Sequence, residues 1–327
     1  MSPASNPATL GRFFGYLGVA VVATLPAIAL RLGGWRPDPL LDAALFGGAI
    51  LAAGFMLSWG AETAEKRVSQ GLIVAAIALV TVLPEYAVDF YYAYAAGQNP
   101  DSNYVHYAAA NMTGANRLLV GLAWPLMVVI HWLRTRERGI ELAPVNAAEI
   151  VFLMIGTAWS FTILFRDAIG WIDSVVLVSI FGAYVWRGSY LPESMVESGR
   201  LIGIDEFLLI QWLAPLASEA PAVTIAVLFV LSGRAANGLA TMISDKINQW
   251  TLLVGMLPLA MSLGAGGLTA LPLDDRQHEE FFLTAAQSLF GIALLLRLRL
   301  GLWGGLALAA LFAIQVGVTL AFLGDEQ

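Results

Sequence analysis

Two proline-containing apolar stretches carry acidic residues that could bind cations. In ALVTVLPEYAVDF, Glu85 directly follows a proline, and Asp89 lies four residues later on the same helical face. In LAPLASEAPAV, Glu219 lies between two prolines. A proline inside a helix leaves a backbone carbonyl without its usual donor, and hard cations prefer carboxylate and carbonyl oxygens. These residue types therefore predict a buried cation site.

Neutral oxygen donors accompany the carboxylates. Thr81 lies one turn before Glu85, and Ser218 directly precedes Glu219. Each stretch is followed by a segment rich in amides. The predicted ligands are the central carboxylates Glu85 and Glu219, the secondary carboxylates Asp89 and Asp245, and the neutral donors Thr81, Asn111, Asn116, Ser218 and Gln249.

Structural roles for the same residues stay open. Pro84 could be a packing kink with Glu85 in a loop, although the flanks of Glu85 are too apolar for a loop. Glu219 could pair with a basic residue, and Lys246, adjacent to Asp245 in an otherwise apolar segment, is a candidate. If the Lys246 ammonium points into the site instead, it could replace one bound cation and favour a proton-coupled or electroneutral cycle.

The composition indicates a membrane protein. Of 327 residues, 58% are hydrophobic and 13% are charged, whereas soluble domains average about half and about a quarter. Cysteine is absent and histidine occurs three times, which excludes disulfides and thiolate metal sites and leaves little for zinc. There is no basic patch for nucleic acid and no motif of ATP-driven transport or of the familiar hydrolases. We therefore expect a transporter and no enzyme.

Ten apolar segments are long enough to cross a bilayer, which requires about 20 residues. The predicted fold class is an all-α polytopic membrane protein of about 10 transmembrane helices. Two of the segments contain proline and acidic residues in mid-span and are predicted to be discontinuous helices. The segments are 13–32, 40–60, 68–96, 104–133, 147–167, 170–187, 201–232, 236–265, 281–297 and 302–323, and the discontinuous ones are 68–96 and 201–232.

The pattern of a discontinuous helix followed by an amide-rich helix occurs twice. Such doubling predicts an internal repeat, with the binding site at the midplane where the two halves meet. The predicted organisation is an extra N-terminal transmembrane helix (1–39), a first half (40–187) with broken helix 68–96 and partner 104–133, a linker (188–200), and a second half (201–327) with broken helix 201–232 and partner 236–265.

Arginines in the connections predict the orientation. The positive-inside rule places the loop at 134–138 and the turn at 297–299 on the cytoplasmic side, which implies inverted repeats. Strict alternation of ten spans would put the 297–299 turn outside, so the number of spans conflicts with the cytoplasmic location that the arginines predict. A crossing is missing between 187 and 201, or a segment between 147 and 187 does not cross fully, or the second half is not inverted.

The first half resembles the sodium/calcium exchanger, or calcium/cation antiporter, superfamily. VTVLPE at 80–85 is similar to the GTSLPE-like motif of that family, with Val82 in place of serine. ANMTGANRLLVG at 110–121 is similar to the GNxxGSN-like partner helix. Leu119 falls where many members have a liganding asparagine. The resemblance covers most of residues 40–323.

The second half resembles the family with a rebuilt ligand set. LASEAPAV at 216–223 has alanine at the family's glutamate position and carries Glu219 about one turn earlier. In ATMISDKINQWTLLVG at 240–255, Asp245 stands at a serine position, Lys246 at an asparagine position and Gln249 at an aspartate position.

The resemblance implies cation exchange by alternating access, commonly of Ca²⁺ against Na⁺ or H⁺. We expect a secondary-active antiporter that exchanges Ca²⁺ or another metal cation for H⁺ or Na⁺ and needs no cofactor, and we favour protons because carboxylates must deprotonate to bind metal. The alternative is a non-transporting or repurposed relative, closed by an ion pair of Lys246 with Asp245 or Glu219. The expected partners are inorganic cations and the lipid bilayer, without nucleic acid, in the inner membrane of a prokaryotic cell with a cytoplasmic N-terminus.

Overall fold

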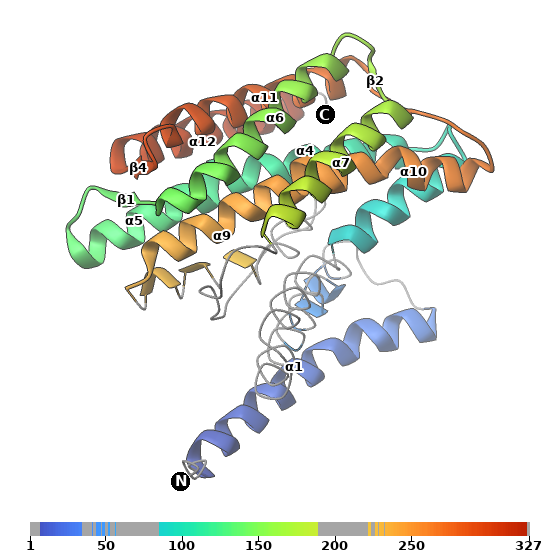
Figure 1. Ribbon diagram of the computed structural model, residues 1–327. Coiled ribbons are helices and arrows are strands. Elements are labelled where there is room, and N and C mark those ends of the chain that lie inside the picture. The colour runs from blue at the N-terminus through green and yellow to red at the C-terminus, as the bar shows by residue number, and fades with distance from the viewer. Residues whose placement is uncertain are drawn as a thin grey trace.

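The computed structural model describes residues 7–34, 85–188 and 233–325 continuously, together with isolated positions between 41 and 56 and between 222 and 231. These residues form a helical bundle with two short strand pairs (Figure 1). The predicted all-α class is confirmed. Four residues of the two proline motifs, Thr81, Pro84, Ser218 and Glu219, lie outside the described residues.

The helices follow the predicted segments closely. In the first half they are the helix at 85–98, α4 (Tyr104–Leu118), η1 (Leu119–Ala123), α5 (Trp124–Thr135), η2 (Pro144–Asn146), α6 (Ala147–Ile163) and α7 (Trp171–Gly188). In the second half they are α9 (Ala235–Asn248), η4 (Gln249–Leu253), α10 (Val254–Ala265), α11 (Asp275–Leu295) and α12 (Leu302–Asp325). The N-terminal helix α1 (Pro7–Gly33) lies apart from the others in Figure 1.

Two long helices share one design. In each, a π-helical turn, η1 or η4, interrupts the α-helix without breaking it, because the flanking residues keep right-handed helical geometry. Each helix ends on a residue in the left-handed conformation, Arg136 (φ 65°) after α5 and Gly266 (φ 70°) after α10. A constant offset of 130 residues separates Leu119 from Gln249 and Arg136 from Gly266. π-Helical turns are rare and are frequent at functional sites.

Two antiparallel strand pairs join the connecting loops. β1 (Gly139–Glu141) pairs with β4 (Arg299–Gly301), and β2 (Ala168–Ile169) pairs with β3 (Leu271–Pro272). The helix α11 separates β3 from β4; its 21 residues span about 32 Å at 1.5 Å per residue. The pairs therefore lie at opposite ends of the bundle, which we call the β1–β4 end and the β2–β3 end (Figure 1).

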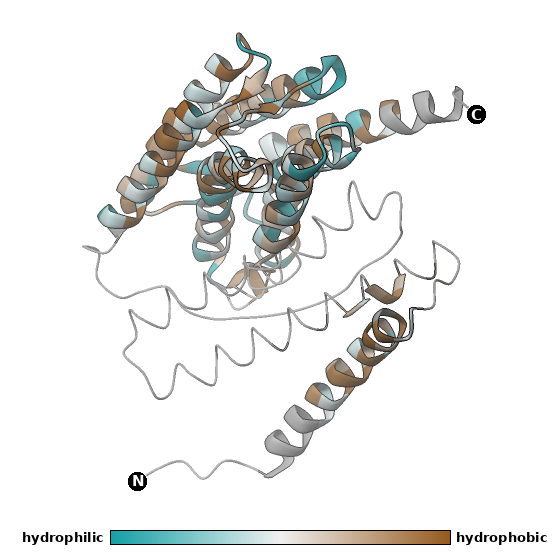
Figure 2. Cartoon of the chain, turned by 90° about the vertical axis from the view of Figure 1, so that its right-hand side faces the viewer, coloured by the Kyte–Doolittle hydropathy of each residue, from teal (hydrophilic) through white to brown (hydrophobic). Residues whose placement is uncertain are grey.

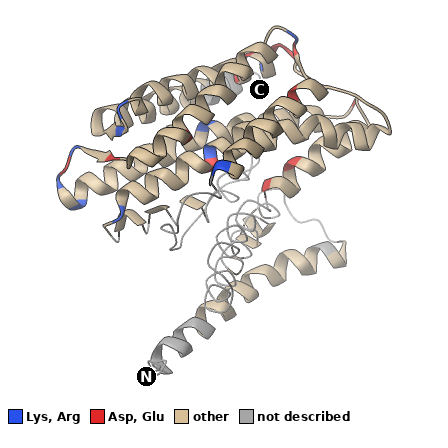
Figure 3. Cartoon of the chain, in the orientation of Figure 1, with Lys and Arg blue, Asp and Glu red and all other residues tan. Residues whose placement is uncertain are grey.

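The strand pairs set the direction of the two long helices. α5 runs into β1 at one end, and α10 runs into β3 at the other. The helix α4–η1–α5 is therefore antiparallel to α9–η4–α10. The loop at 134–138 and the turn at 297–299 share the β1–β4 end, as predicted from their arginines, and Figure 3 shows basic residues gathered there.

The helices α6 and α7 are joined by a turn at the β2–β3 end. α6 leads from β1 to β2, and α7 returns along α10 and η4. Their 17 and 18 helical residues each cover about 26 Å, and whether both segments cross the membrane fully stays a prediction. Residues 187–201, where a crossing was predicted to be missing, lie almost entirely outside the described part of the chain.

Packing reverses the usual arrangement of polar and apolar residues. Large apolar side chains such as Val175, Leu263 and Trp303 are exposed, while Asp89, Lys246 and Gln249 are buried. Figure 2 shows helices that are predominantly hydrophobic. Among the described residues, Tyr104–Thr135 and Pro144–Ile163 are long and apolar enough to cross a membrane. This distribution is the one that lipid imposes on a helical bundle.

Two glycines allow the helix at 85–98 to pack closely against α10. A Cβ at Gly97 would collide with the backbone of Met261, and one at Gly264 would collide with the backbone of Tyr94. The helix therefore packs backbone to backbone against α10, as small residues permit in membrane proteins. This contact holds Glu85 against the second half.

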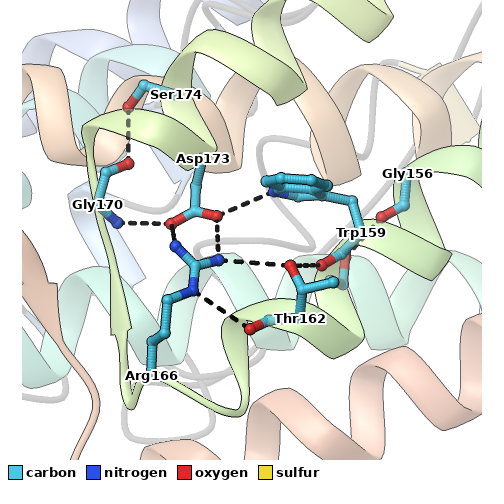
Figure 4. Close-up of polar contacts among 8 residues, drawn as sticks. Gly156, Trp159, Thr162, Arg166, Gly170, Asp173 and Ser174 are labelled. Carbon is cyan, nitrogen blue, oxygen red and sulfur yellow. Dashed lines mark hydrogen bonds and ion pairs between the residues drawn. The ribbon is translucent and has the colours of Figure 1, made fainter.

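An ion pair between Arg166 and the buried Asp173 fixes the turn between α6 and α7 (Figure 4). Arg166 donates to both oxygens of Asp173, at 2.6 and 3.0 Å. Trp159 Nε1 and the backbone N–H of Gly170 donate to the same carboxylate, at 2.9 and 2.8 Å. Because both oxygens have several donors, Asp173 is a structural group at the β2–β3 end.

Candidate cation site

Three described helical segments bring seven of the predicted site residues into the interior of the bundle. The exposed fraction of each residue is 9% or less. Glu85 and Asp89 come from the helix at 85–98, Asn111 and Asn116 from α4, and Asp245, Lys246 and Gln249 from α9 and η4.

Glu85 is joined to the second half of the chain. Gln249 Nε2 donates to Glu85 Oε2 at 3.2 Å, and the neighbouring Tyr86 hydroxyl donates to Asn248 Oδ1 at 2.7 Å. Both partners lie at the junction of α9 and η4. The structure thus brings together Glu85 and Gln249, which the sequence placed in one site although 164 positions separate them.

Asp89 forms the second polar contact of the site. Asn111 Nδ2 donates to Asp89 Oδ1 at 2.7 Å. Asp89 Oδ2 and Asn111 Oδ1 are buried and have no hydrogen-bond partner among the described residues. Asp173, by contrast, has donors at both oxygens. Burying an ionised carboxylate with so few donors costs several kcal/mol, and a cation or a proton would offset that cost.

One tyrosine lies near three carboxylates. Tyr86 lies within electrostatic range of Glu85, Asp89 and Asp245. Asp245 therefore belongs to the same acidic cluster, although it comes from α9. Carboxylate and amide oxygens are the ligand types that a hard cation such as Ca²⁺ prefers, but no three acidic or histidine side chains of the described residues lie close enough together to hold a metal ion.

Lys246 points toward the first half. Its Nζ donates to Asn116 Oδ1 at 2.7 Å and approaches the Asn116 backbone oxygen at 3.4 Å. It also lies 4.4 Å from the centre of the Trp250 ring, a favourable cation–π geometry. Lys246 pairs with no carboxylate in the described part of the chain. The closed-site alternative, which requires such a pair, is not supported.

Several contributors were not predicted. Tyr86 and Asn248 link the halves directly, and Trp250 covers the Lys246 ammonium. The first two were detectable as neighbours of predicted ligands. The aromatic partner of Lys246 was detectable only from its spacing of four residues, which places both side chains on one helical face. The π-helical turns have no signature in composition.

The comparison with known families identifies the class of protein. The model of the family "Sodium/calcium exchanger protein" matches residues 40–188 and 185–321. The chain belongs to this family, as the sequence motifs indicated. Its members are integral membrane proteins that move inorganic cations such as Ca²⁺, so the chain is a transporter and not an enzyme.

Solved structures place the chain more narrowly. It is similar to the crystal structure of the H⁺/Ca²⁺ exchanger CAX, with 37% identity over 92% of this chain and 87% of that chain and a TM-score of 0.83. The sodium-calcium exchanger NCX_Mj (17% identity, 84% and 98% coverage, TM-score 0.58) and the Ca²⁺/H⁺ antiporter protein YfkE (12% identity, 93% and 98% coverage, TM-score 0.63) share the fold. No curated relative matches the chain.

Proposed function

We propose that this chain is a secondary-active antiporter that exchanges Ca²⁺ for H⁺ by alternating access. The observation that carries the proposal is the contact of Glu85 with Gln249, beside Asp89 and Asn111, deep between the two halves. Carboxylates in such a place can hold a metal cation or protons in turn. The similarity to a structure named as an H⁺/Ca²⁺ exchanger supports protons over Na⁺ as the counter-ion.

The architecture that we propose is a pair of inverted repeats. Two observations support it. The helix α4–η1–α5 runs antiparallel to α9–η4–α10, and each strand of the first half, β1 or β2, pairs with a strand of the second half, β4 or β3. The repeats comprise residues 40–187 and 201–327, with the extra helix at 1–39 and about 10 spans in all. The arginines of the β1–β4 end support a cytoplasmic location of that end.

The proposed ligand set extends beyond the described residues. Glu85 and Glu219 are the central carboxylates, Asp89 and Asp245 are secondary, and Lys246 substitutes for one cation on the oxygen of Asn116. Because the Lys246 ammonium is part of the protein, bound ions need to supply less positive charge to neutralise the carboxylates. The neutral ligands are Thr81, Asn111, Asn116, Ser218 and Gln249.

The test is ⁴⁵Ca²⁺ uptake by proteoliposomes under an imposed ΔpH or an imposed Na⁺ gradient. We expect uptake with ΔpH that collapses with a protonophore, and none above background with Na⁺ alone. Uptake driven only by Na⁺ would contradict the counter-ion. Absence of uptake under both gradients would contradict antiport.

A further inference from the structure

Two glutamates occupy matched positions outside the cation site. Glu149 of α6 lies eight residues after the end of β1 at Glu141, and Glu280 of α11 lies eight residues after the end of β3 at Pro272. Each glutamate contacts the amide-rich helix of the other half. Glu149 accepts from Ser244 of α9 at 3.0 Å, and Glu280 accepts from Thr113 of α4 at 3.3 Å.

The two glutamates differ in their counter-charges. Glu280 lies 3.5 Å from Arg117 and 3.6 Å from Arg276. Glu149 accepts only from the neutral groups of Ser244 and Asn146, both at 3.0 Å, and no basic side chain of the described residues pairs with it. A carboxylate that is half-buried without a counter-charge in a membrane helix is costly, and such groups commonly mark ion pathways.

The surroundings of Glu149 lead to the cation site. Ser244, its donor, is the residue next to Asp245. On α7, Tyr184 lies within electrostatic range of both Glu149 and Asp245. Among the described residues, Tyr184 and Asp245 are thus the titratable groups near Glu149.

The position of Glu149 is intermediate along the bundle. It lies in the first turn of α6, close to the β1–β4 end, and is half-buried, whereas Lys246 and Gln249 are fully buried. Glu149 therefore lies between these buried residues and the β1–β4 end.

We propose that Glu149 is a proton-transit site between the cation site and the β1–β4 end. It takes up the exchanged proton on its carboxylate and releases it toward the cation site or toward solvent. The inference rests on the proposed antiport and deepens it. A purely structural role is the competing explanation, because an acidic residue in the first turn stabilises a helix.

The test compares wild type, Glu149→Gln and Glu149→Asp in proteoliposomes. Glutamine keeps an oxygen that can accept from Ser244 and Asn146 but cannot ionise. We expect the initial ΔpH-driven Ca²⁺ uptake of Glu149→Gln to fall about tenfold and to depend less steeply on the pH at the β1–β4 side. Equilibrium ⁴⁵Ca²⁺ binding should be unchanged, and Glu149→Asp should restore the pH profile.

Glu280→Gln is the matched control, because it makes the same chemical change at the matched position. It should lower the melting temperature, since Arg117 loses its buried partner, and leave the pH profile of transport per folded protein unchanged. A wild-type rate and pH profile in Glu149→Gln would overturn the transit site, as would a lower melting temperature with an unchanged profile. If wild type shows no ΔpH-driven uptake, the antiport proposal itself fails and the transit site falls with it.

Discussion

The two halves of the molecule share a frame and differ in chemistry. η1 and η4 interrupt their helices at positions 130 residues apart, yet Leu119 opens the first turn and Gln249 opens the second. The same offset pairs Asn116 with Lys246, and these two side chains contact each other across the centre. The two halves therefore share their backbone geometry but carry different charges at matched positions.

The outer contacts show the same division. The glutamate that reaches α4 is neutralised by Arg117, whereas the glutamate that reaches α9 has neutral partners. The first contact holds helices together, and the second leaves a carboxylate that can change its protonation.

Removing the central carboxylate of the first half should have the largest effect. Glu85→Gln eliminates a buried charge in the acidic cluster and should weaken Ca²⁺ binding at least about a hundredfold, or about 2.8 kcal/mol. Isothermal titration in detergent measures it. Glu141→Gln makes the same change on a side chain that is 80% exposed at the β1–β4 end and serves as control. Equal affinities of the two variants would contradict the site.

Replacing Lys246 by asparagine, the residue at the matched position 116, tests the difference in charge between the two halves. Lys246→Asn removes the tethered ammonium and should strengthen Ca²⁺ binding about tenfold, because the site becomes more negative by one charge. The charge moved per Ca²⁺, read as current on supported membranes, should change as well. Lys246→Arg keeps the charge and is the control. An unchanged affinity in Lys246→Asn would mean that the ammonium balances no ion charge.

The smallest effect concerns the π-helical turn of the second half. Gln249→Leu gives η4 the residue that opens η1 and removes the donor to Glu85. One such bond contributes about 1 kcal/mol, so Ca²⁺ affinity should fall roughly fivefold. Leu119→Gln, the reverse change in the first half, should not compensate when the two are combined. Recovery of wild-type affinity in the double variant would show that the halves are interchangeable.

Much of the inner site was predictable because its residues violate the rules for lipid-facing helices. Acidic and amide residues in long apolar segments singled out Glu85, Asp89, Asn111 and Gln249, and the structure buries all four. The positions of the arginines alone predicted that the loop at 134–138 and the turn at 297–299 lie at the same end of the bundle. Glu219 and Thr81 stay predictions, because they lie outside the described residues.

Other features depend on contacts that no local pattern encodes. The direction of Lys246 is set by Asn116, which is 130 positions away. The strand pairs comprise only two or three residues each, too few for a period to be read. Among the described residues, Glu280 has an arginine as counter-charge and Glu149 has none, because α11 and α6 pack against opposite halves.

Protons released on Ca²⁺ binding test the central claim most directly, since one buried set of carboxylates is proposed to hold either ion. Ca²⁺ is added to the purified protein in a weakly buffered detergent solution, and the change in pH is recorded with the heat of binding. We predict proton release with each Ca²⁺ bound, an affinity that rises with pH, and a smaller release in Glu85→Gln at saturating Ca²⁺. Ca²⁺ binding without proton release at any pH would contradict the account.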